Sequence, residues 1–322
     1  MTAVDETTVR PESSGLSCPL CRSSAVNTVE ASARDHFTGD EFCIVRCREC
    51  EVAWTHPFPA TLSRYYPAVY RRYSRPVLAV LRWLYRRRAA RWSTLFRRPG
   101  SALELGCGDG YMLDALRDLG WKVAGTERNQ AMARHAREQL GITVHVDGEE
   151  RLPDQGFDLV IMFQVLEHLP HPLDTLHRCA SLLAEDGKVV VGVPNFESWQ
   201  RRYGRNGWFH LDPPRHLFHY SPGALIRAAG RSGLRASDVG FVSLEHDPYG
   251  WTQTILNRAL RDDNRLTRLL MGSVLPRWTD VGLVAAAGAL LVPSVVLALA
   301  SWLFRRGALM EVVFERDRGS GA

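Results

Sequence analysis

Lysine is nearly absent from this chain of 322 residues. Of the 40 lysine and arginine residues, only Lys122 and Lys188 are lysine, an excess of arginine that fits a genome-composition bias better than a chemical need. Neither lysine follows a tyrosine at the Tyr-x-x-x-Lys spacing, so the sequence offers no such pair for hydride chemistry. Apolar residues make up 45% of the chain and charged residues 23%, which excludes an intrinsically disordered protein.

The first residues also lack a hydrophobic run. The stretch MTAVDETTVRPESSG is polar, so we expect no secretory signal peptide there and a disordered tail over 1–15. Seven cysteines without a secretory signal indicate a reducing compartment. The sequence therefore predicts a protein that faces the cytoplasm.

Four of the cysteines form two close pairs, Cys18 with Cys21 and Cys47 with Cys50. Two thiolates three positions apart on a tight turn can bind one tetrahedral Zn²⁺, and a second such turn completes the site. Apolar side chains are few in this region, so a metal would supply folding free energy that burial cannot. We predict a structural zinc ion in a zinc-ribbon-like module over 16–60. A disulfide or redox pair and free core cysteines are the alternatives.

Acidic residues are absent from 52–103, where eleven arginines are mixed with aromatic residues. Apolar residues at 77, 78, 81, 84 and 85 have helical spacing after Pro76, which suits a first helical turn. A basic amphipathic helix with Trp and Tyr suits an anionic membrane surface. A solvated connector over 61–100 is the plain alternative. Nucleic acid is a third and less favoured option, and we expect no nucleic-acid partner.

The segment SALELGCGDGYMLDAL places an apolar strand before Gly106, Gly108 and Gly110, and an amphipathic helix after them. Such glycines allow a tight turn against a ligand. Glu104 lies two positions before the first glycine, where it can bind a cationic amino group. Glu127 ends the next strand, where it can accept hydrogen bonds from ribose hydroxyls. Strands and helices then alternate, which predicts a doubly wound α/β sheet.

These motifs resemble those of the class I S-adenosylmethionine-dependent methyltransferases. ELGCGDG is similar to their first motif, FDLVIMFQVLEHLPHPLDTL to the segment after their fourth strand, and LLAEDGKVVVGVPN to their fifth-strand region. The cysteine pairs and the later GWFHLDPPRHLFHYSP resemble a bacterial subgroup associated with methylation of polysaccharides, lipids and natural products. The resemblance implies a Rossmann-like seven-stranded sheet over 101–247, completed by a last strand at 308–317.

The family pattern also implies which residues contact S-adenosylmethionine. In chain order these residues would contact its methionine end, its ribose and its adenine. Asp147 would lie near the adenine amino group, and Phe163 would cover the adenine ring. The expected contacts are Glu104, Gly106, Gly108, Gly110, Glu127, Asp147, Gly148, Phe163 and Gln164. A solvated loop position remains the alternative for Asp147.

Histidine and aromatic residues gather in 204–222, after the fifth strand, at the edge of the sheet where ligands bind in such folds. Methyl transfer to oxygen or carbon needs a base, and histidine titrates in the right range. We predict His216 or His219 as that base, with His168 lining the pocket and Arg215 holding an anionic or hydroxylated part of the acceptor. For each of these histidines a structural role is an equal alternative.

An uncharged stretch of 24 residues, 281–304, precedes the last predicted strand. As a helix it would extend about 36 Å, enough for a bilayer core of about 30 Å. Pro293 divides it, and proline breaks or kinks a helix. Because the last two strands of the fold pair, both ends of the stretch must lie on one side of a membrane. We therefore predict a hairpin that dips into one leaflet. A helical pair in a soluble dimer interface and a single span are the alternatives.

Together these inferences predict a methyltransferase that is peripheral or monotopic on the inner face of the cell membrane. The insertion over 248–307 would hold it there, with an anionic membrane surface as partner and a lipid-linked or amphiphilic acceptor, such as a saccharide. Two other functions stay open. One is a soluble O-methyltransferase of a small metabolite whose insertion forms a dimer interface, and the other is a non-catalytic membrane adaptor.

Overall fold

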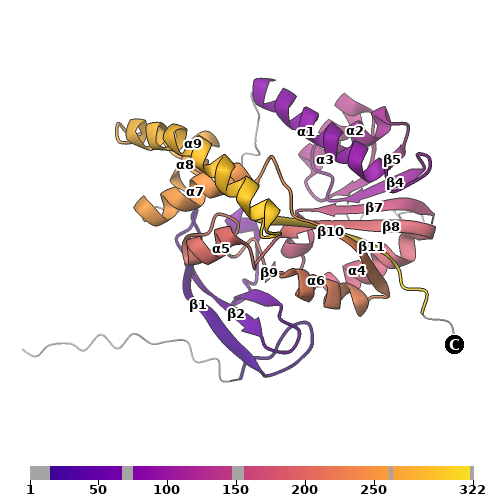
Figure 1. Ribbon diagram of the computed structural model, residues 1–322, viewed down its shortest axis with the longest axis horizontal. Coiled ribbons are helices and arrows are strands. Elements are labelled where there is room, and N and C mark those ends of the chain that lie inside the picture. Colours follow the sequence, from indigo (N-terminus) through magenta and orange to yellow (C-terminus); the bar gives the residue numbers. More distant parts are fainter. Residues whose placement is uncertain (1–14, 67–74, 147–155, 261–263, 320–322) are drawn as a thin grey trace, which may run out of the picture.

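The computed structural model describes residues 15–66, 75–146, 156–260 and 264–319, so the predicted tail lies almost wholly outside the described residues. A seven-stranded sheet with helices on both faces forms the main body, and a four-stranded sheet lies beside it (Figure 1). Three helices of the insertion project from the large sheet, above the small sheet in this view. The predicted α/β class with a seven-stranded sheet is confirmed.

The large sheet has the strand order β10-β11-β8-β7-β4-β5-β6. Strands β8, β7, β4, β5 and β6 are parallel, and β11 is antiparallel to both of its neighbours. The carboxyl ends of the parallel strands meet at one edge, where ligands bind in such folds. The bounds are β4 (Ser101–Leu105), β5 (Lys122–Glu127), β6 (Thr143–Val146), β7 (Phe157–Phe163), β8 (Leu183–Pro194), β10 (Leu234–Gly240) and β11 (Leu309–Arg316).

Alternate residues of β7 face opposite sides of the sheet. Leu159 and Ile161 pack with residues of α1 and α2, whereas Val160 and Met162 pack with residues of α4 and α6. A strand buried on both faces needs apolar residues at successive positions, which explains the run LVIMF. The helices are α1 (Arg75–Ser93), α2 (Tyr111–Asp118), α3 (Gln130–Leu140), α4 (Pro172–Leu182), α5 (Trp199–Gly204) and α6 (Pro222–Gly230), with 3₁₀ turns η1 (Ser63–Tyr65), η2 (Leu166–His168) and η3 (Arg205–Gly207).

The small sheet joins the cysteine-containing segment to the central domain. Its order is β1 (Val26–Arg34), β2 (Glu41–Cys47), β3 (Ala53–His56) and β9 (Phe218–His219). Strand β9 belongs to the histidine-rich segment that follows β8, and Trp54 of β3 lies opposite Phe218 of β9. The pairing therefore builds part of 204–222 into the N-terminal sheet.

Helix α1 has ion pairs on the side where sequence analysis expected a membrane-facing basic surface. Arg88 is buried and its Nε lies 2.8 Å from Oε1 of Glu311. Arg82 lies 2.7 Å from Oδ2 of Asp114, and Arg86 pairs with a second acid of α2. These acids are distant in the sequence, so the absence of acids within 52–103 did not reveal that the arginines would be neutralised.

The insertion consists of α7 (Asp247–Leu260), α8 (Arg265–Leu270) and α9 (Asp280–Leu303). Helix α9 is continuous through Pro293, so the predicted hairpin broken at this proline is wrong. An interior proline costs a helix about 3 kcal/mol, and contacts of α9 with α7 can offset this cost. Within the described part of the chain, α9 alone has the length and hydropathy to cross a membrane, a property that core helices of soluble proteins share.

The chain returns to the sheet along α9, which lies beside α7 (Figure 1). Strand β11 then pairs with β10, with Leu234 opposite Arg316 and Gly240 opposite Glu311. The predicted pairing of the last two strands is confirmed. It excludes a single span that would leave the last strand unpaired on the far side of a membrane.

Candidate cofactor and acceptor site

A glycine-rich turn joins β4 to α2. Gly106, Gly108 and Gly110 have φ angles of 70°, 54° and 81°, in the left-handed region that disfavours residues with a Cβ. A Cβ at Gly106 would also lie 2.7 Å from Cγ2 of Val165, which follows β7. Gly106 is therefore required both for the backbone conformation and for the close approach of two strand ends.

Glu127 at the end of β5 is bonded to the same turn. Its Oε2 accepts a hydrogen bond from the backbone N–H of Gly108 at 2.9 Å, and its Oε1 accepts one from Asn129 at 2.8 Å. Each carboxylate oxygen can accept a further hydrogen bond. The carboxylate is thus oriented at the sheet edge with capacity left for ribose hydroxyls, the role predicted for it.

Glu104 is buried at the end of β4, and its Oε2 has no hydrogen-bond partner among the described residues. Burial raises the pKa of this carboxyl well above its ordinary range, and the nearby carboxylate of Glu127 raises it further. A buried acid without a partner is costly unless a cation or donor compensates it. The ammonium group of S-adenosylmethionine would do so, and the residues of this turn fit that cofactor.

Two further predicted contacts, Phe163 and Gln164, lie at the end of β7. Gln164 has a φ of 57°, its N–H donates to the carbonyl of Gly192 at 2.8 Å, and its Nε2 is buried without a partner among the described residues. Phe163 leans toward β8, because Gly192 has no side chain there, and Arg88 lies 4.2 Å above its ring centre. The ring therefore lies on the β8 side of β7, and the assignment of Phe163 to the adenine stays a prediction.

Two predicted adenine contacts cannot be placed. Asp147 and Gly148 lie outside the described residues, in the segment 147–155 after β6. Their assignment stays a prediction.

The three predicted histidines lie close together beside the end of β7. The rings of His168 and His216 have centroids 4.7 Å apart, and those of His216 and His219 lie 6.5 Å apart. Burial lowers the pKa of His168 to about 3, and it also lowers the pKa of His216 and, strongly, that of His219. All three are therefore neutral near pH 7, but the same burial makes them weak bases, since a general base works best with a pKa near the working pH.

The surroundings of these histidines differ. His168 is partly exposed, and Nδ1 lies 3.4 Å from the hydroxyl of Tyr66. His219 is buried, stacks on Phe196 and has its Nε2 3.1 Å from Oγ1 of Thr55. These are the contacts of a packed histidine, so of the three, His168 has the better access to an acceptor. The catalytic assignments stay predictions.

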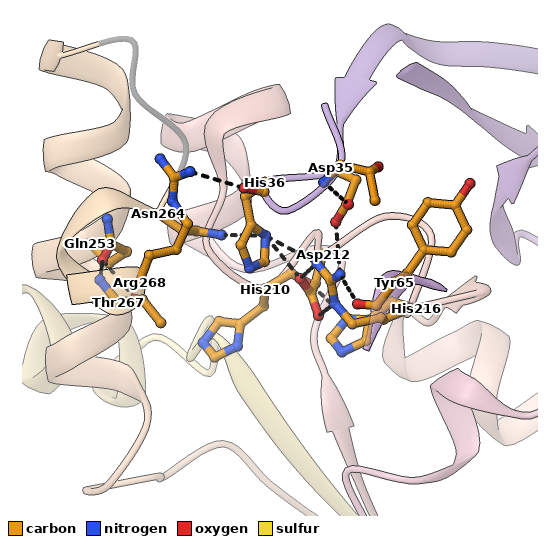
Figure 2. A network of polar contacts seen from close by, with 12 residues as sticks. Asp35, His36, Tyr65, His210, Asp212, His216, Gln253, Asn264, Thr267 and Arg268 are labelled. Atoms are coloured by element: carbon orange, nitrogen blue, oxygen red, sulfur yellow. Dashed lines mark hydrogen bonds and ion pairs between the residues drawn. The ribbon is translucent and has the colours of Figure 1, made fainter. Parts of the chain in front are cut away.

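A polar network fixes the segment 204–222 (Figure 2). Arg215 donates to Asp212, Asp35, the carbonyl of Tyr65 and Nδ1 of His36, with the Asp35 and Tyr65 contacts both at 2.7 Å. All five of its N–H donors are thereby used. Arg215 therefore holds the loop against the N-terminal sheet, and the expectation that it binds the acceptor is wrong.

Sequence reasoning missed two residues near this edge. His246, which follows β10, has its ring 5.8 Å from that of Phe163 and 6.4 Å from that of His210. Oε1 of Gln200 and Nε2 of His210 are buried without partners among the described residues. A Cβ on Gly250 would lie 2.8 and 2.9 Å from these two atoms. No local motif marks His246 or Gln200, because only the folded chain brings α5 and α7 to the end of β7.

The four cysteine sulfurs of the predicted zinc site lie within 4.8 Å of one another. Cys18 and Cys50 have their sulfurs 3.5 Å apart, as do Cys21 and Cys47. Tetrahedral zinc with Zn–S bonds of about 2.3 Å places sulfurs about 3.8 Å apart. The residues fit a structural zinc ion, with sulfur at each of its four positions.

A doubly wound sheet with this glycine turn, a carboxylate at the end of the next strand and a buried acid before the first glycine defines a nucleotide-cofactor-binding α/β enzyme. A family model described as a methyltransferase domain matches residues 77–238, half of the chain. The chain belongs to this methyltransferase-domain family.

Curated relatives agree with this class. A probable S-adenosylmethionine-dependent methyltransferase of Mycolicibacterium smegmatis is 32% identical over 125 residues, which cover 37% of this chain and 49% of that relative. The chain therefore spans about half the length of this relative. A ubiquinone biosynthesis O-methyltransferase of Roseobacter denitrificans is 27% identical over 180 residues, 49% of this chain and 68% of that protein.

Among solved structures, a putative sarcosine dimethylglycine methyltransferase from Galdieria sulphuraria is similar with a TM-score of 0.46 and 16% identity. The superposition covers 77% of this chain and 92% of that one.

Proposed function

We propose that the protein methylates an amphiphilic, lipid-linked acceptor while α9 lies on the inner face of the cell membrane. One observation carries the proposal: the outward side of α9 is apolar along its whole length. With 24 residues the helix is about 36 Å long. Exposed apolar patches of this extent are rare on monomeric soluble proteins and mark interaction sites.

The inward side of α9 is already occupied. Leu283 packs with Leu256 of α7 and Leu266 of α8, and the hydroxyl of Thr252 donates to that of Ser294 at 2.9 Å. The remaining side carries valine and leucine to solvent, with Val292 70% and Leu303 79% exposed. Since α7 and α8 cover only one side, a bilayer surface fits the other, and a helix lying in the surface needs no second crossing.

The ends of α9 also suit an interface. Trp278 precedes the helix and is 88% exposed, and Phe304 follows it and is 62% exposed. Aromatic residues favour the region between hydrocarbon and water. Arg305 and Arg306 come next and would remain at the level of anionic head groups.

S-adenosylmethionine supplies an electrophilic methyl group when bound. The residues of this chain would position it. Glu104 would bind its ammonium group, Glu127 would bind its ribose, and the glycine turn at 106–110 would leave room for its methionine end. His168 is the partly exposed histidine of the three and would contact the acceptor. Much of the rate gain would come from holding acceptor and methyl group in line.

The relatives named as ubiquinone biosynthesis O-methyltransferases favour oxygen as the acceptor atom and an amphiphilic acceptor. A saccharide on a lipid carrier and a quinone-like ring both meet these requirements. The same apolar side of α9 also supports a second candidate, a soluble metabolite methyltransferase that dimerises through α9. A non-catalytic adaptor is disfavoured by the intact turn and the unpartnered Glu104.

The test uses the full chain with a labelled methyl donor and a lipid extract of its host. Label in the organic phase, together with flotation of the protein on anionic vesicles, is the expected result. A variant with Val292→Lys and Val296→Lys on the outward side should stay soluble and lose flotation, whereas lysines at the exposed positions Arg178 and Arg202 should not change it. Label found only in aqueous molecules, with a protein that dimerises and does not float, would establish the second candidate instead.

A further inference from the structure

Three side chains that could bind one metal ion converge beside the cofactor turn. A carboxylate oxygen of Glu167, a ring nitrogen of His168 and a ring nitrogen of His216 all lie within 4.8 Å of one another. Glu167 and His168 belong to η2, directly after Val165, whose side chain packs against Gly106. His216 comes from the segment 204–222, so two segments distant in the sequence form the group.

Hydrogen bonds fix the tautomer of both histidines. Nδ1 of His168 lies 2.8 Å from the carbonyl oxygen of Arg215, and Nδ1 of His216 lies 2.9 Å from that of His210. A carbonyl oxygen can only accept, so each Nδ1 carries the proton. Each Nε2 then keeps its lone pair. A backbone carbonyl on the other ring nitrogen is a common way in which proteins orient a metal-binding imidazole.

Glu167 lacks any compensation within the described residues. Its side chain is buried, and both of its carboxylate oxygens are without a hydrogen-bond partner there. Arg215, which precedes His216, uses its donors on Asp212, Asp35 and other acceptors. Burial of a carboxyl group without a compensating partner is unfavourable. A bound cation would remove that cost.

We propose that Glu167, His168 and His216 bind a divalent transition-metal ion through one carboxylate and two Nε2 atoms. Two imidazoles and one carboxylate favour Zn²⁺, Co²⁺, Fe²⁺ or Mn²⁺ over Mg²⁺ and Ca²⁺, which prefer oxygen ligands. Three protein ligands leave coordination positions open, as in catalytic rather than structural sites. An oxygen of the acceptor is the ligand that fits there. That last role rests on the proposed methyl transfer, whereas ion binding does not.

The site is held by the same network that fixes the loop. His216 follows Arg215, which is bonded to Asp35, and Asp212 lies 3.5 Å from Nδ1 of His36 (Figure 2). The hydroxyl of Thr55 also donates to the carbonyl of His216 at 2.7 Å. His216 is therefore positioned before any ion arrives. His168 is partly exposed, whereas Glu167 and His216 are buried.

The test measures metal binding by the full chain with its four-cysteine site filled with zinc. Titration with Co²⁺ under anaerobic conditions should show one further equivalent, with weak nitrogen–oxygen type absorption and no thiolate charge-transfer band. Glu167→Gln and His168→Gln should each remove that equivalent, while binding of S-adenosylmethionine and circular dichroism remain unchanged. The matched control His177→Gln changes an exposed histidine and should retain it.

Failure of the wild-type chain to bind Co²⁺ beyond the cysteine site overturns the proposal. Equal binding by the wild-type chain and the Glu167→Gln variant also overturns it. Because His216 is buried, His216→Gln is used only if its circular dichroism matches the wild type. If the wild-type chain binds the further Co²⁺ but transfers no methyl group, the proposed function is contradicted and the metal site still stands.

Discussion

The indole Nε1 of Trp302 donates a 2.5 Å hydrogen bond to Oδ2 of Asp247. It joins the last turn of α9 to the first turn of α7, so the two ends of the insertion meet at one carboxylate. Asp247 also accepts hydrogen bonds from the backbone N–H groups of Ala308 and Leu309 at 3.1 and 3.2 Å. One buried side chain thus connects the beginning of the insertion, its end and the first residues of β11.

The stability of this junction should depend on pH. Burial raises the pKa of Asp247 from 3.8 to about 7. The unfolded chain loses this proton near pH 4, whereas the folded chain keeps it until about pH 7, so the contribution to stability is present at low pH and is lost as pH rises to 7. The change corresponds to about 4 kcal/mol at most. Asp247→Asn should remove this dependence, measured as the difference in free energy of unfolding from the wild type in urea at several pH values.

The control for this experiment is Asp186→Asn, since the side chain of Asp186 is 92% exposed. Its difference from the wild type should not vary with pH. If the Asp247→Asn difference is equally flat between about pH 4 and pH 8, Asp247 is not protonated in the folded protein.

Glu104→Gln should weaken binding of S-adenosylmethionine. The substitution preserves shape but removes the charge that the ammonium group would meet, and a hydrogen bond to a charged group contributes about 1.5–3 kcal/mol. We expect the dissociation constant to rise about 10- to 100-fold by calorimetry. Glu185→Gln, at an exposed position, is the control. Unchanged affinity in Glu104→Gln would show that the ammonium group binds elsewhere.

Gly106→Ala should destabilise the protein for two separable reasons. The left-handed φ costs about 1–2 kcal/mol for a residue with a Cβ, and the new methyl group meets Val165 at 2.7 Å. Adding Val165→Ala should relieve the contact but not the backbone strain. The double variant should therefore lose less stability than the sum of the single variants in chemical denaturation. Strict additivity would mean that the two residues do not touch.

Cys47→Ser should release zinc from the four-cysteine cluster and destabilise the small sheet, because three remaining thiolates leave the tetrahedral site open. Cys43→Ala is the matched control, since Cys43 lies in the same strand outside the cluster. Zinc per chain, measured by mass spectrometry after dialysis, should fall for the first variant only. Wild-type protein that retains no zinc after dialysis would refute the site.

Arg88→Met should destabilise the fold by about 3–5 kcal/mol, because it removes the arginine that pairs with two buried carboxylates, Glu245 and Glu311, of which Glu311 keeps its contacts with Arg91 and Trp92. Arg87→Met changes the neighbouring exposed residue and should remain within about 0.5 kcal/mol of the wild type. Comparable thermal stability of the two variants would mean that Arg88 is not part of a buried ion cluster.

The sheet and its cofactor turn could be predicted because their signals are local. The glycines of 106–110 and the apolar run of β7 each mark their own structure within a few residues. The roles of Arg215 and His246 could not be predicted, since contacts with distant segments, such as Asp35 for Arg215 and Phe163 for His246, decide where these side chains lie. The prediction at Pro293 failed for a related reason. Proline locally favours a helix break, but packing of α9 on α7 keeps the helix continuous. The positions of these side chains and the course of α9 therefore depend on contacts with distant elements rather than on the local sequence pattern.

Helix α7 has a second set of contacts on the side away from α9. The hydroxyl of Thr254 accepts a hydrogen bond from the N–H of Phe209, and Asn257 donates to the carbonyl of Gly207, both in the loop that carries His216. Helix α7 thus contacts both α9, with its exposed apolar side, and the segment 204–222. A partner that binds the outward side of α9 is therefore connected through a single helix, α7, to the segment that carries His216.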